Sequence, residues 1–327
     1  MLKALVTGAT GFIGSHLAEA LCQKGIQVRC LVRKTSHLNW LKPLHVEMVR
    51  GDCNHPDSLA EAVEGVDEVF HLAGVTRALE DKTYFEVNGL GTENLVHACL
   101  KKSPGLRKFI YLSSQAAAGP CRNGGRKKES DRCEPVSSYG QSKRMGEEMA
   151  LAHSHEIPLI ILRPCSVYGP RDRDFYTFFR LLSKRIRLCL AGADRHVSLC
   201  YIRDMVDALL LAAESPESKG EIFFISDGRA YQMQEVGEII ARAMGISPFP
   251  LSIPRWTLSG IASVAEYLAR FSGNPPLLSK GKVEEMVQRN WVCDISKARD
   301  LLGFEPKFEL QQGAKLTFDW YKEERWL

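Results

Sequence analysis

Three glycines, at positions 8, 11 and 14, stand between a short apolar run and a helical pattern. Residues 3–7 have the aliphatic and β-branched composition of a buried strand, and residues 15–24 repeat apolar side chains with the period of a helix. In such a strand–turn–helix, glycines let the turn tighten, let the backbone approach a pyrophosphate and let the helix pack closely on the sheet. The phosphates then lie at a helix N-terminus, where unpaired N–H groups and the helix dipole favour anions. These residues are therefore predicted to bind a dinucleotide, with phosphate contacts from Gly8, Gly11, Phe12, Ile13 and Gly14.

Short β-rich runs alternate with helical patterns through the first half of the 327-residue chain, which is typical of a parallel sheet covered by helices. The predicted strands are 3–7, 27–32, 46–49, 68–72, 108–112 and 159–162, and the predicted helices are 15–24, 58–63, 89–102 and 138–153. Beyond these elements the alternation weakens and prolines cluster. We therefore predict an α/β fold with a doubly wound parallel Rossmann sheet in residues 1–165. Residues 166–327 are predicted to form mainly a smaller substrate-binding lobe, with segments that return to the sheet.

Composition excludes several classes of protein. The formal net charge of +4 is too small for a nucleic-acid-binding surface unless it is clustered, and the basic run 126–128 is expected to be a solvated part of a surface loop, 121–134. No apolar run approaches the roughly 18–20 residues of a membrane span. The apolar run near the N-terminus is too short for the hydrophobic region of a signal peptide. The ten cysteines contain no C-x-x-C pair and lie in apolar stretches, which disfavours zinc and a disulfide framework. These patterns predict a cytoplasmic protein with a small-molecule substrate, no metal and no nucleic-acid partner.

The end of the second predicted strand indicates which dinucleotide is bound. A site for NAD usually has Asp or Glu about 20 residues after the glycines, to bind the ribose hydroxyl. No acidic residue lies between Glu19 and Glu47, and the strand ends at Arg33 and Lys34. A guanidinium suits the 2′-phosphate of NADP, so NADP(H) is favoured. The alternative is that Arg33 covers the strand end or stacks on the adenine of NAD.

Tyr139 and Lys143 are spaced i and i+4 in the predicted helix 138–153, so their side chains share one face. A free phenol titrates near pH 10, and an adjacent ammonium, helped by an oxidised nicotinamide ring, is expected to lower that pKa towards the working pH. Ser114 follows the strand 108–112, at the edge where the active sites of open parallel sheets gather. In isolation Ser114 would be interpreted as a helix or turn cap. Beside Tyr139 and Lys143 it is predicted to be catalytic.

The G-x-x-G-x-x-G spacing, together with these three residues, resembles the extended branch of the short-chain dehydrogenase/reductase superfamily, which contains epimerases, dehydratases and reductases. The resemblance covers nearly the whole chain. Residues 87–92 are similar to the family's V-N-x-x-G-T element, and residues 163–170 to its R-P-x-x-V-Y-G-P segment beside the nicotinamide. By this resemblance the cofactor contacts also include Asp52, Cys53, Leu72, Ala73, Gly74, Asn88, Tyr139, Lys143, Pro164 and Val167.

The resemblance implies transfer of a hydride between a carbinol carbon and the nicotinamide. Tyr139 would then give or take the hydroxyl proton, Lys143 would hold the ribose, and Ser114 would orient the carbonyl. A net oxidoreductase, similar to dihydroflavonol reductases and 3β-hydroxysteroid dehydrogenases, is favoured. Gln115 and Ala116 follow Ser114, where dehydratases usually carry an acidic pair.

Two other functions stay open. A nucleotide-sugar epimerase would return the hydride and retain NAD, but such enzymes commonly carry an arginine where this chain has Val197. Arg195 lies close enough in sequence for a shifted loop to restore that contact. A non-enzymatic NADP-binding sensor or scaffold is the second alternative, and the intact catalytic residues argue against it.

Two further expectations concern surfaces. Helices 89–102 and 138–153 match the pair through which the superfamily commonly forms dimers, so a homodimer is expected, with Ala98, Met145, Met149 and Ala152 available for its interface. The apolar segment 254–271 suggests a lid over a hydrophobic substrate. An ordinary packed helix, with Ile261, Val264, Ala265 and Leu268 on its buried face, is the favoured interpretation.

Overall fold

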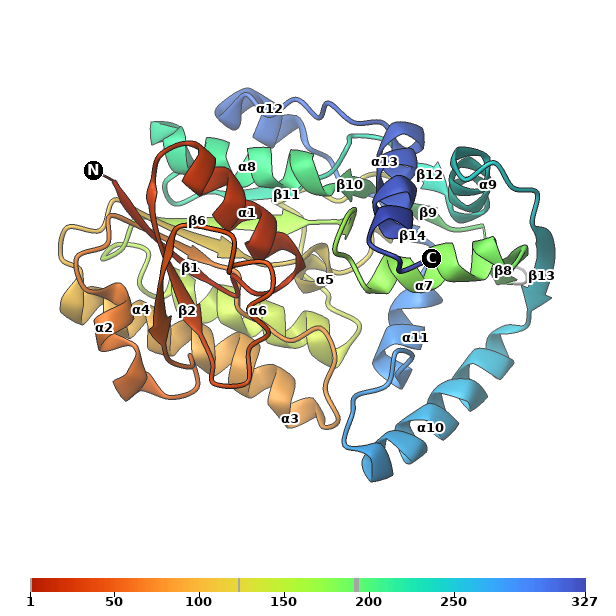
Figure 1. Cartoon of the computed structure of the whole chain (residues 1–327), viewed down its shortest axis with the longest axis horizontal. Coiled ribbons are helices and arrows are strands. Elements are labelled where there is room, and N and C mark those ends of the chain that lie inside the picture. Colours follow the sequence, from red (N-terminus) through yellow and green to blue (C-terminus); the bar gives the residue numbers. More distant parts are fainter. Residues whose placement is uncertain (1, 123, 191–193) are drawn as a thin grey trace.

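A parallel sheet of seven strands forms the centre of the protein (Figure 1). This computed structural model describes residues 2–122, 124–190 and 194–327. The strands run in the order β11-β6-β5-β4-β1-β2-β3, and every neighbouring pair is parallel. Their bounds are β1 (Lys3–Thr7), β2 (Gln27–Val32), β3 (Val46–Arg50), β4 (Glu68–His71), β5 (Lys108–Leu112), β6 (Leu159–Pro164) and β11 (Ile222–Ile225). The predicted doubly wound α/β fold is confirmed.

Helices cover both faces of this sheet because its side chains alternate between two apolar cores. In β1, Ala4 and Val6 belong to one core, whereas Leu5 belongs to the other. The first core is completed by α1 (Phe12–Gln23) and α8 (Ile202–Glu214), and the second by α2 (Ala60–Val63), α4 (Gly91–Lys102) and α6 (Ser138–Leu151). The other helices are α3 (Asp81–Tyr84), α5 (Gln115–Ala118), α7 (Asp174–Ser183), α9 (Met233–Ala243), α10 (Arg255–Ser272), α11 (Lys280–Met286), α12 (Ser296–Leu302) and α13 (Leu310–Glu323).

The predicted elements of the first half appear with small shifts at their ends. Helix α1 starts three residues earlier than predicted, since Gly11 is its N-cap and Phe12 and Ile13 already belong to its first turn. The helix predicted from residue 89 is preceded by a π-helical segment, η2 (Phe85–Leu90), which runs directly into α4. Wide helical turns of this kind often occur at functional sites.

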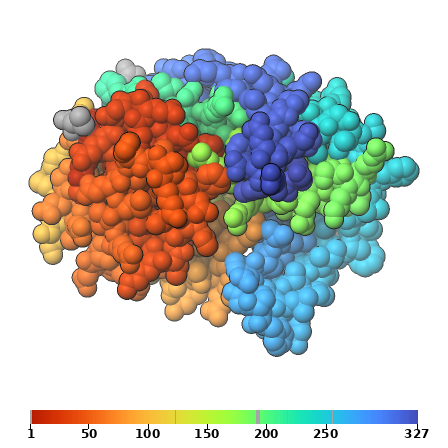
Figure 2. All heavy atoms as spheres, in the orientation of Figure 1, coloured from red at the N-terminus to blue at the C-terminus, as the bar shows by residue number. Residues whose placement is uncertain are grey.

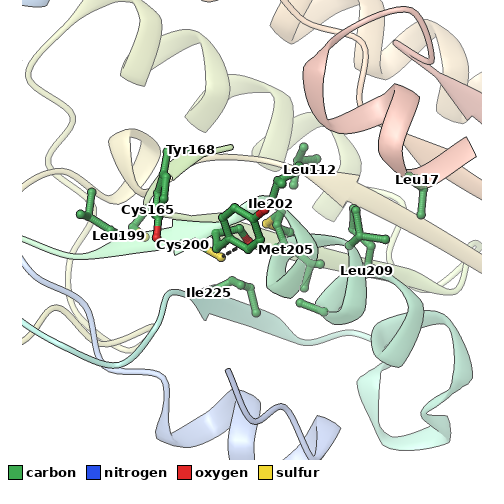
Figure 3. Packing of buried hydrophobic residues seen from close by; sticks show 14 of the residues in the cluster. Leu17, Leu112, Cys165, Tyr168, Leu199, Cys200, Ile202, Met205, Leu209 and Ile225 are labelled. Atoms are coloured by element: carbon green, nitrogen blue, oxygen red, sulfur yellow. Dashed lines mark hydrogen bonds between the residues drawn. The ribbon is translucent and has the colours of Figure 1, made fainter. Parts of the chain in front are cut away.

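The second half of the chain builds small sheets and then returns to the central one. The short strands are β7 (Ser166–Tyr168), β8 (Ile186–Leu190), β9 (His196–Val197), β10 (Leu199–Tyr201), β12 (Tyr231–Gln232), β13 (Phe249–Ile253) and β14 (Asn290–Trp291). β7 pairs with β10, and β11 joins the central sheet beside β6. Figure 3 shows Cys165, Tyr168, Cys200, Met205 and Ile225 from these parts packed together. One core therefore links the later segments to the sheet.

Two sequence expectations about exposure are wrong. Lys127 is buried and donates a hydrogen bond of 2.8 Å to the carbonyl oxygen of Arg132, so only its neighbours Arg126 and Lys128 are solvated. Helix α10 buries Leu258, Ala262 and Ala269, whereas most of its expected core face (Ile261, Val264 and Leu268) is exposed. Among the described residues, no helix is long and apolar enough to cross a membrane.

Candidate active site

The glycine turn fits closely against the end of β4. Gly8 has a left-handed φ of +69°, and a Cβ there would lie 2.6 Å from the carbonyl carbon and oxygen of Leu72. A Cβ on Gly14 would lie 2.2 Å from the carbonyl oxygen of Gly8, so the start of α1 rests on the turn. No side chain caps α1, and its first turn contains no acidic residue. The turn therefore presents backbone N–H groups to an anion, as a dinucleotide pyrophosphate requires.

A buried chain of hydrogen bonds, not anticipated from the sequence, supports this turn. Thr7 Oγ1 accepts from the N–H of Ala73 at 3.0 Å and lies 2.8 Å from His71 Nδ1. On the other side of the ring, His71 Nε2 lies 3.0 Å from Thr92 Oγ1, whose hydroxyl donates to the carbonyl oxygen of Asn88. Because Thr92 donates onwards, it accepts from Nε2–H, and Nδ1 accepts from Thr7. Burial lowers the pKa of His71 to about 3, which keeps this neutral relay in place across the physiological pH range.

The residues predicted to contact the adenine end of the cofactor lie at the carboxyl ends of β2 and β3. Arg33 is exposed directly after β2, and its charge acts on the buried thiol of Cys53, so these two residues are close in space. Asp52 accepts from the N–H of Asn54 at 3.0 Å, which fixes the turn that carries Cys53. Three of the predicted contacts therefore converge at one edge of the sheet.

Asn88 holds the neighbouring turn. Its Oδ1 accepts from the N–H of Val75 at 2.8 Å, and its Nδ2 donates to the carbonyl oxygen of Val75 and to Ser142 Oγ. The side chain is fully buried, and both of its polar atoms are engaged within the protein. Asn88 therefore fixes the segment after Gly74 and ties it to α6.

The three predicted catalytic residues come together at the carboxyl end of β5. Ser114 caps α5, where its Oγ accepts from the N–H of Ala116 at 3.1 Å, and it also forms a hydrogen bond with the phenol of Tyr139. Tyr139 and Lys143 follow one another on the same face of α6. The ammonium of Lys143 donates to the carbonyl oxygen of Leu112 at 2.8 Å and lies 4.3 Å from the centre of the Tyr111 ring. Ser114 can therefore be a cap and a site residue at once.

In the protein without a cofactor, burial is the main influence on the protonation states of Tyr139 and Lys143. Burial raises the pKa of Tyr139 to about 12, with smaller upward contributions from Glu285 and Tyr84, and the hydrogen bond of Ser114 opposes this only in part. Burial also lowers the pKa of Lys143 to about 7, against the pull of Glu147. A lysine that is partly neutral near pH 7 attracts a phenolate weakly. In the protein alone, Tyr139 is therefore a proton donor at neutral pH.

A buried ion pair lies one turn beyond Lys143. The carboxylate of Glu147 accepts from Ser113 Oγ at 2.6 Å, from Arg163 Nε at 2.7 Å and Nη2 at 2.6 Å, and from Arg144 Nη1 at 3.2 Å. Glu147 and Arg163 are almost completely buried. Sequence reasoning missed Glu147, although its i+8 position after Tyr139 places it on the same face of α6. The pair joins α6 to β6 directly before Pro164.

The last predicted cofactor contacts lie at the end of β6 and in β7. Pro164 is buried and pairs with Ile225 of β11, whereas Val167 is half-buried and pairs with Cys200 of β10. Gly169 follows, and the carbonyl oxygen of Pro170 lies 2.9 Å from Nε2 of His16 in α1. The segment therefore runs from the catalytic edge of the sheet back to the first helix.

The second half of the chain adds a carboxylate that the sequence did not indicate. Glu285 of α11 accepts a hydrogen bond of 2.6 Å from Ser137 Oγ, which in turn caps α6 by accepting from the N–H of Gly140. Val197 lies half-buried in β9, and Arg195 Nη1 donates to the carbonyl oxygen of Met286 at 2.6 Å. The start of the catalytic helix is thus held by a residue nearly 150 positions later in the chain.

A family model described as the NAD dependent epimerase/dehydratase family matches residues 4–226, which is more than half of the chain. The chain belongs to this family. The predicted membership of the extended short-chain dehydrogenase/reductases is confirmed, and with it an enzyme of the NAD-dependent oxidoreductase or epimerase type.

Relatives of this chain include enzymes with different activities. A ceramide reductase of Caulobacter vibrioides is 29% identical over 324 residues, covering 98% of this chain and 95% of that protein. A 3 beta-hydroxysteroid dehydrogenase/Delta 5-->4-isomerase of Mycobacterium tuberculosis is 29% identical, with coverages of 98% and 90%. A UDP-glucose 4-epimerase of Vibrio cholerae is 29% identical, with coverages of 96% and 93%.

Among solved structures, MoeE5 in complex with UDP-glucuronic acid and NAD superimposes with a TM-score of 0.79 at 25% identity. The match covers 98% of this chain and 99% of that one. The fold extends over both halves of the chain, including the residues after 165.

Proposed function

We propose that this member of the epimerase/dehydratase family is an NADP(H)-dependent reductase of a small carbonyl substrate. The observation that carries the proposal is the cluster of Ser114, protonated Tyr139 and Lys143 at the carboxyl end of β5, on the same edge of the sheet as the glycine turn. Tyr139 is protonated at neutral pH and hydrogen-bonded to Ser114, so it holds a proton that a carbonyl reduction can use.

The residues present fit a dinucleotide. Gly8 and Gly14 leave no room for a Cβ and open the N-terminus of α1 to a pyrophosphate. Gly11, Phe12 and Ile13 would complete the phosphate contacts, and Leu72, Ala73, Gly74, Pro164 and Val167 would line the nicotinamide side. Asn88 acts indirectly, because its side chain is engaged by Val75 and Ser142. When bound, the cofactor supplies the reducing equivalents.

Each catalytic side chain then has a distinct task. Ser114 donates to the carbonyl oxygen of the substrate and fixes its position. Tyr139 delivers the proton to that oxygen as it becomes a hydroxyl. Lys143 holds the ribose hydroxyls and, in its charged form, compensates the charge that Tyr139 acquires.

Arg33 supports a preference for NADP(H). It stands exposed after β2, beside Cys53 and Asp52, and no acidic side chain follows β2 before Glu47. A guanidinium there suits the 2′-phosphate. The test is to compare Michaelis constants for NADPH and NADH. A clear NADH preference that survives Arg33→Ala would contradict the proposal.

A nucleotide-sugar epimerase is the second candidate, because the Vibrio cholerae relative is a UDP-glucose 4-epimerase and MoeE5 binds UDP-glucuronic acid and NAD. The substrate side of Tyr139 argues for a reductase. The charged neighbour of Tyr139 from α11 is the carboxylate of Glu285. Val197 stands where sugar-nucleotide enzymes commonly carry an arginine, and Arg195 donates to the carbonyl oxygen of Met286 in α11. The carboxylate of Glu285, which Lys282 pairs with at 3.2 Å, disfavours a sugar diphosphate beside Tyr139 more than a neutral carbonyl compound.

One incubation separates the two candidates. With NADPH and a panel of carbonyl compounds, a reductase consumes NADPH. With UDP- and dTDP-hexoses, an epimerase isomerises the sugar without net consumption. Isomerised sugar with no oxidised cofactor would replace the reductase by the epimerase.

The proposal also covers the roles of the two halves of the chain, the oligomeric state and the cellular compartment. Residues 1–165 act mainly as the cofactor domain and residues 166–327 as the substrate lobe. The outward side of α4 and α6, with Ala98, Met145 and Met149 half-buried and Ala152 exposed, serves a homodimer. The ten free cysteines support a reducing compartment such as the cytoplasm.

A further inference from the structure

Helix α10 exposes a large apolar surface that no described element covers. Six of its bulky apolar side chains are 51–77% exposed: Trp256, Ile261, Val264, Tyr267, Leu268 and Phe271. Three of them are aromatic, and their rings alone present roughly 300 Å² to solvent. Monomeric proteins rarely expose contiguous apolar patches beyond a few hundred Å² unless the patch binds something.

The exposed side chains share one side of the helix. At about 100° per residue, the six positions fall within an arc of about 140°. The opposite side, with Leu258, Ala262 and Ala269, is buried. The exposed side also borders a shallow hollow of about 410 Å³, lined by Leu268, Leu277 and neighbouring residues of α10 and the loop after it. One face of α10 therefore packs on the protein, and its second apolar face is exposed to solvent.

This surface continues into the preceding strand. Phe249 and Leu251 of β13 are 81% and 52% exposed. β13 leads into α10 through Pro254, and it pairs with β8, which follows the basic residues Lys184 and Arg185. In Figure 2, α10 and α11 stand out from the rest of the molecule as a separate projection. The apolar face therefore sits where a flat surface can reach it.

Positive charge is concentrated around this face. Residues 249–289 contain five Lys or Arg against three Glu, and residues 180–190 contain four Lys or Arg and no acidic residue. Together these two segments carry a formal charge of +6, against +4 for the whole chain. Arg187 is paired with Glu238 of α9 at 2.9 Å, whereas Lys184, Arg185 and Arg270 are exposed. An apolar face with Trp, Tyr and Phe, bordered by cations, complements the surface of a membrane that contains anionic lipids.

From these observations we infer that the exposed face of α10, with Phe249 and Leu251, docks on the surface of an anionic phospholipid bilayer. The helix lies in the interface and does not span it: the aromatic side chains enter the headgroup region, and Arg270, Lys184 and Arg185 contact lipid phosphates. A second copy of this chain is the competing occupant. The excess of positive charge disfavours it, because two such faces repel each other.

The docked helix leads directly to the catalytic residues. The buried side of α10 packs in one cluster with Val283 of α11, and Glu285 of α11 holds Ser137 at the start of α6. Docking would therefore bring the helix pair that contacts the start of α6 to the bilayer, in which a lipophilic carbonyl substrate would dissolve. This last step rests on the proposed function, whereas the docking itself does not.

The test is co-flotation of the whole protein with vesicles of phosphatidylcholine, with and without phosphatidylglycerol, in the absence of any substrate. We expect binding to the anionic vesicles and a loss on the order of tenfold or more in Trp256→Ser/Phe271→Ser and in Ile261→Ser/Val264→Ser. Arg270→Glu should lose about fivefold or more. The matched control is Met48→Ser, which removes an exposed apolar side chain from β3 and should bind as the wild type does.

Two results would overturn the inference. One is that the wild-type protein does not bind anionic vesicles. The other is that Trp256→Ser/Phe271→Ser binds them as well as the wild type does. If the wild type does not bind vesicles, and sedimentation velocity shows that Trp256→Ser/Phe271→Ser dissociates an oligomer of the wild type, the exposed face of α10 binds a second copy of this chain. Far-UV circular dichroism and urea unfolding, measured on each variant, show that it is folded. Because no turnover enters the assay, a failed carbonyl reduction leaves this test unaffected.

Discussion

Replacing Glu147 by glutamine removes one charge from the buried ion pair one helical turn beyond Lys143. The carboxylate is fully buried and accepts four hydrogen bonds, two of them from the guanidinium of Arg163. Breaking a buried pair on one side leaves an uncompensated charge and costs about 3–5 kcal/mol of stability. Glu147 also holds the pKa of Lys143 up against burial. In Glu147→Gln we expect this pKa to fall below about 7, so that Lys143 is largely neutral at pH 7.

Two assays measure these effects. Urea unfolding should give a free energy of unfolding about 3–5 kcal/mol below that of the wild type. The pH dependence of kcat/KM for NADPH reports groups of the free enzyme, and its alkaline limb should move to lower pH. Glu148→Gln makes the same chemical change on the next, exposed residue, which pairs with Arg144, and should cost less than about 1 kcal/mol. Equal stabilities and identical pH profiles for the two variants would refute the reasoning.

The remaining predictions concern the cofactor turn, its adenine end and pH. Arg33→Ala should raise the KM for NADPH about tenfold or more and leave that for NADH unchanged, whereas Lys42→Ala should change neither; steady-state kinetics measures both. Gly14→Ala places a Cβ 2.2 Å from a carbonyl oxygen of the turn and should weaken NADPH binding at least about tenfold by calorimetry, while Gly105→Ala, in open space, should bind normally. Folding lowers the pKa of Lys143 from 10.5 to about 7. Between pH 7 and pH 10.5 the unfolded chain therefore keeps a proton on Lys143 that the folded protein has lost, so the free energy of unfolding should rise with pH across that window. Urea unfolding of Lys143→Met should show a flatter dependence, and an unchanged slope would contradict the assignment.

Local patterns were sufficient to predict most of the cofactor half. The alternation of β-rich and helical runs follows from side chains that face two cores, and it placed the strand 108–112 and the helix that starts at residue 138 correctly. The glycine turn was predictable for the same reason, since Gly8 and Gly14 are required by contacts within one short unit. That Ser114, Tyr139 and Lys143 come together was predictable from the end of the strand 108–112 and from the i, i+4 spacing in the helix.

Features that depend on distant parts of the chain could not be predicted. Lys127 is buried because its loop pairs with Cys293, far along the sequence. Glu285 lies in a polar helix whose approach to Ser137 leaves no local signal. The protonation of Tyr139 and Lys143 depends on burial, which their spacing does not reveal. Helix α10 has apolar residues on both sides, so its periodicity alone did not identify which side the protein covers.

Turnover of the Tyr139→Phe variant tests the central claim most directly. NADPH consumption with the best carbonyl compound of the panel should fall by roughly 10²–10⁴-fold, because the hydroxyl that donates the proton is absent. NADPH affinity should stay close to that of the wild type. Tyr84→Phe, which alters a ring 6.2 Å from that of Tyr139, is the matched control and should keep most of its activity. Near-normal turnover in Tyr139→Phe would contradict the proposed role of this residue.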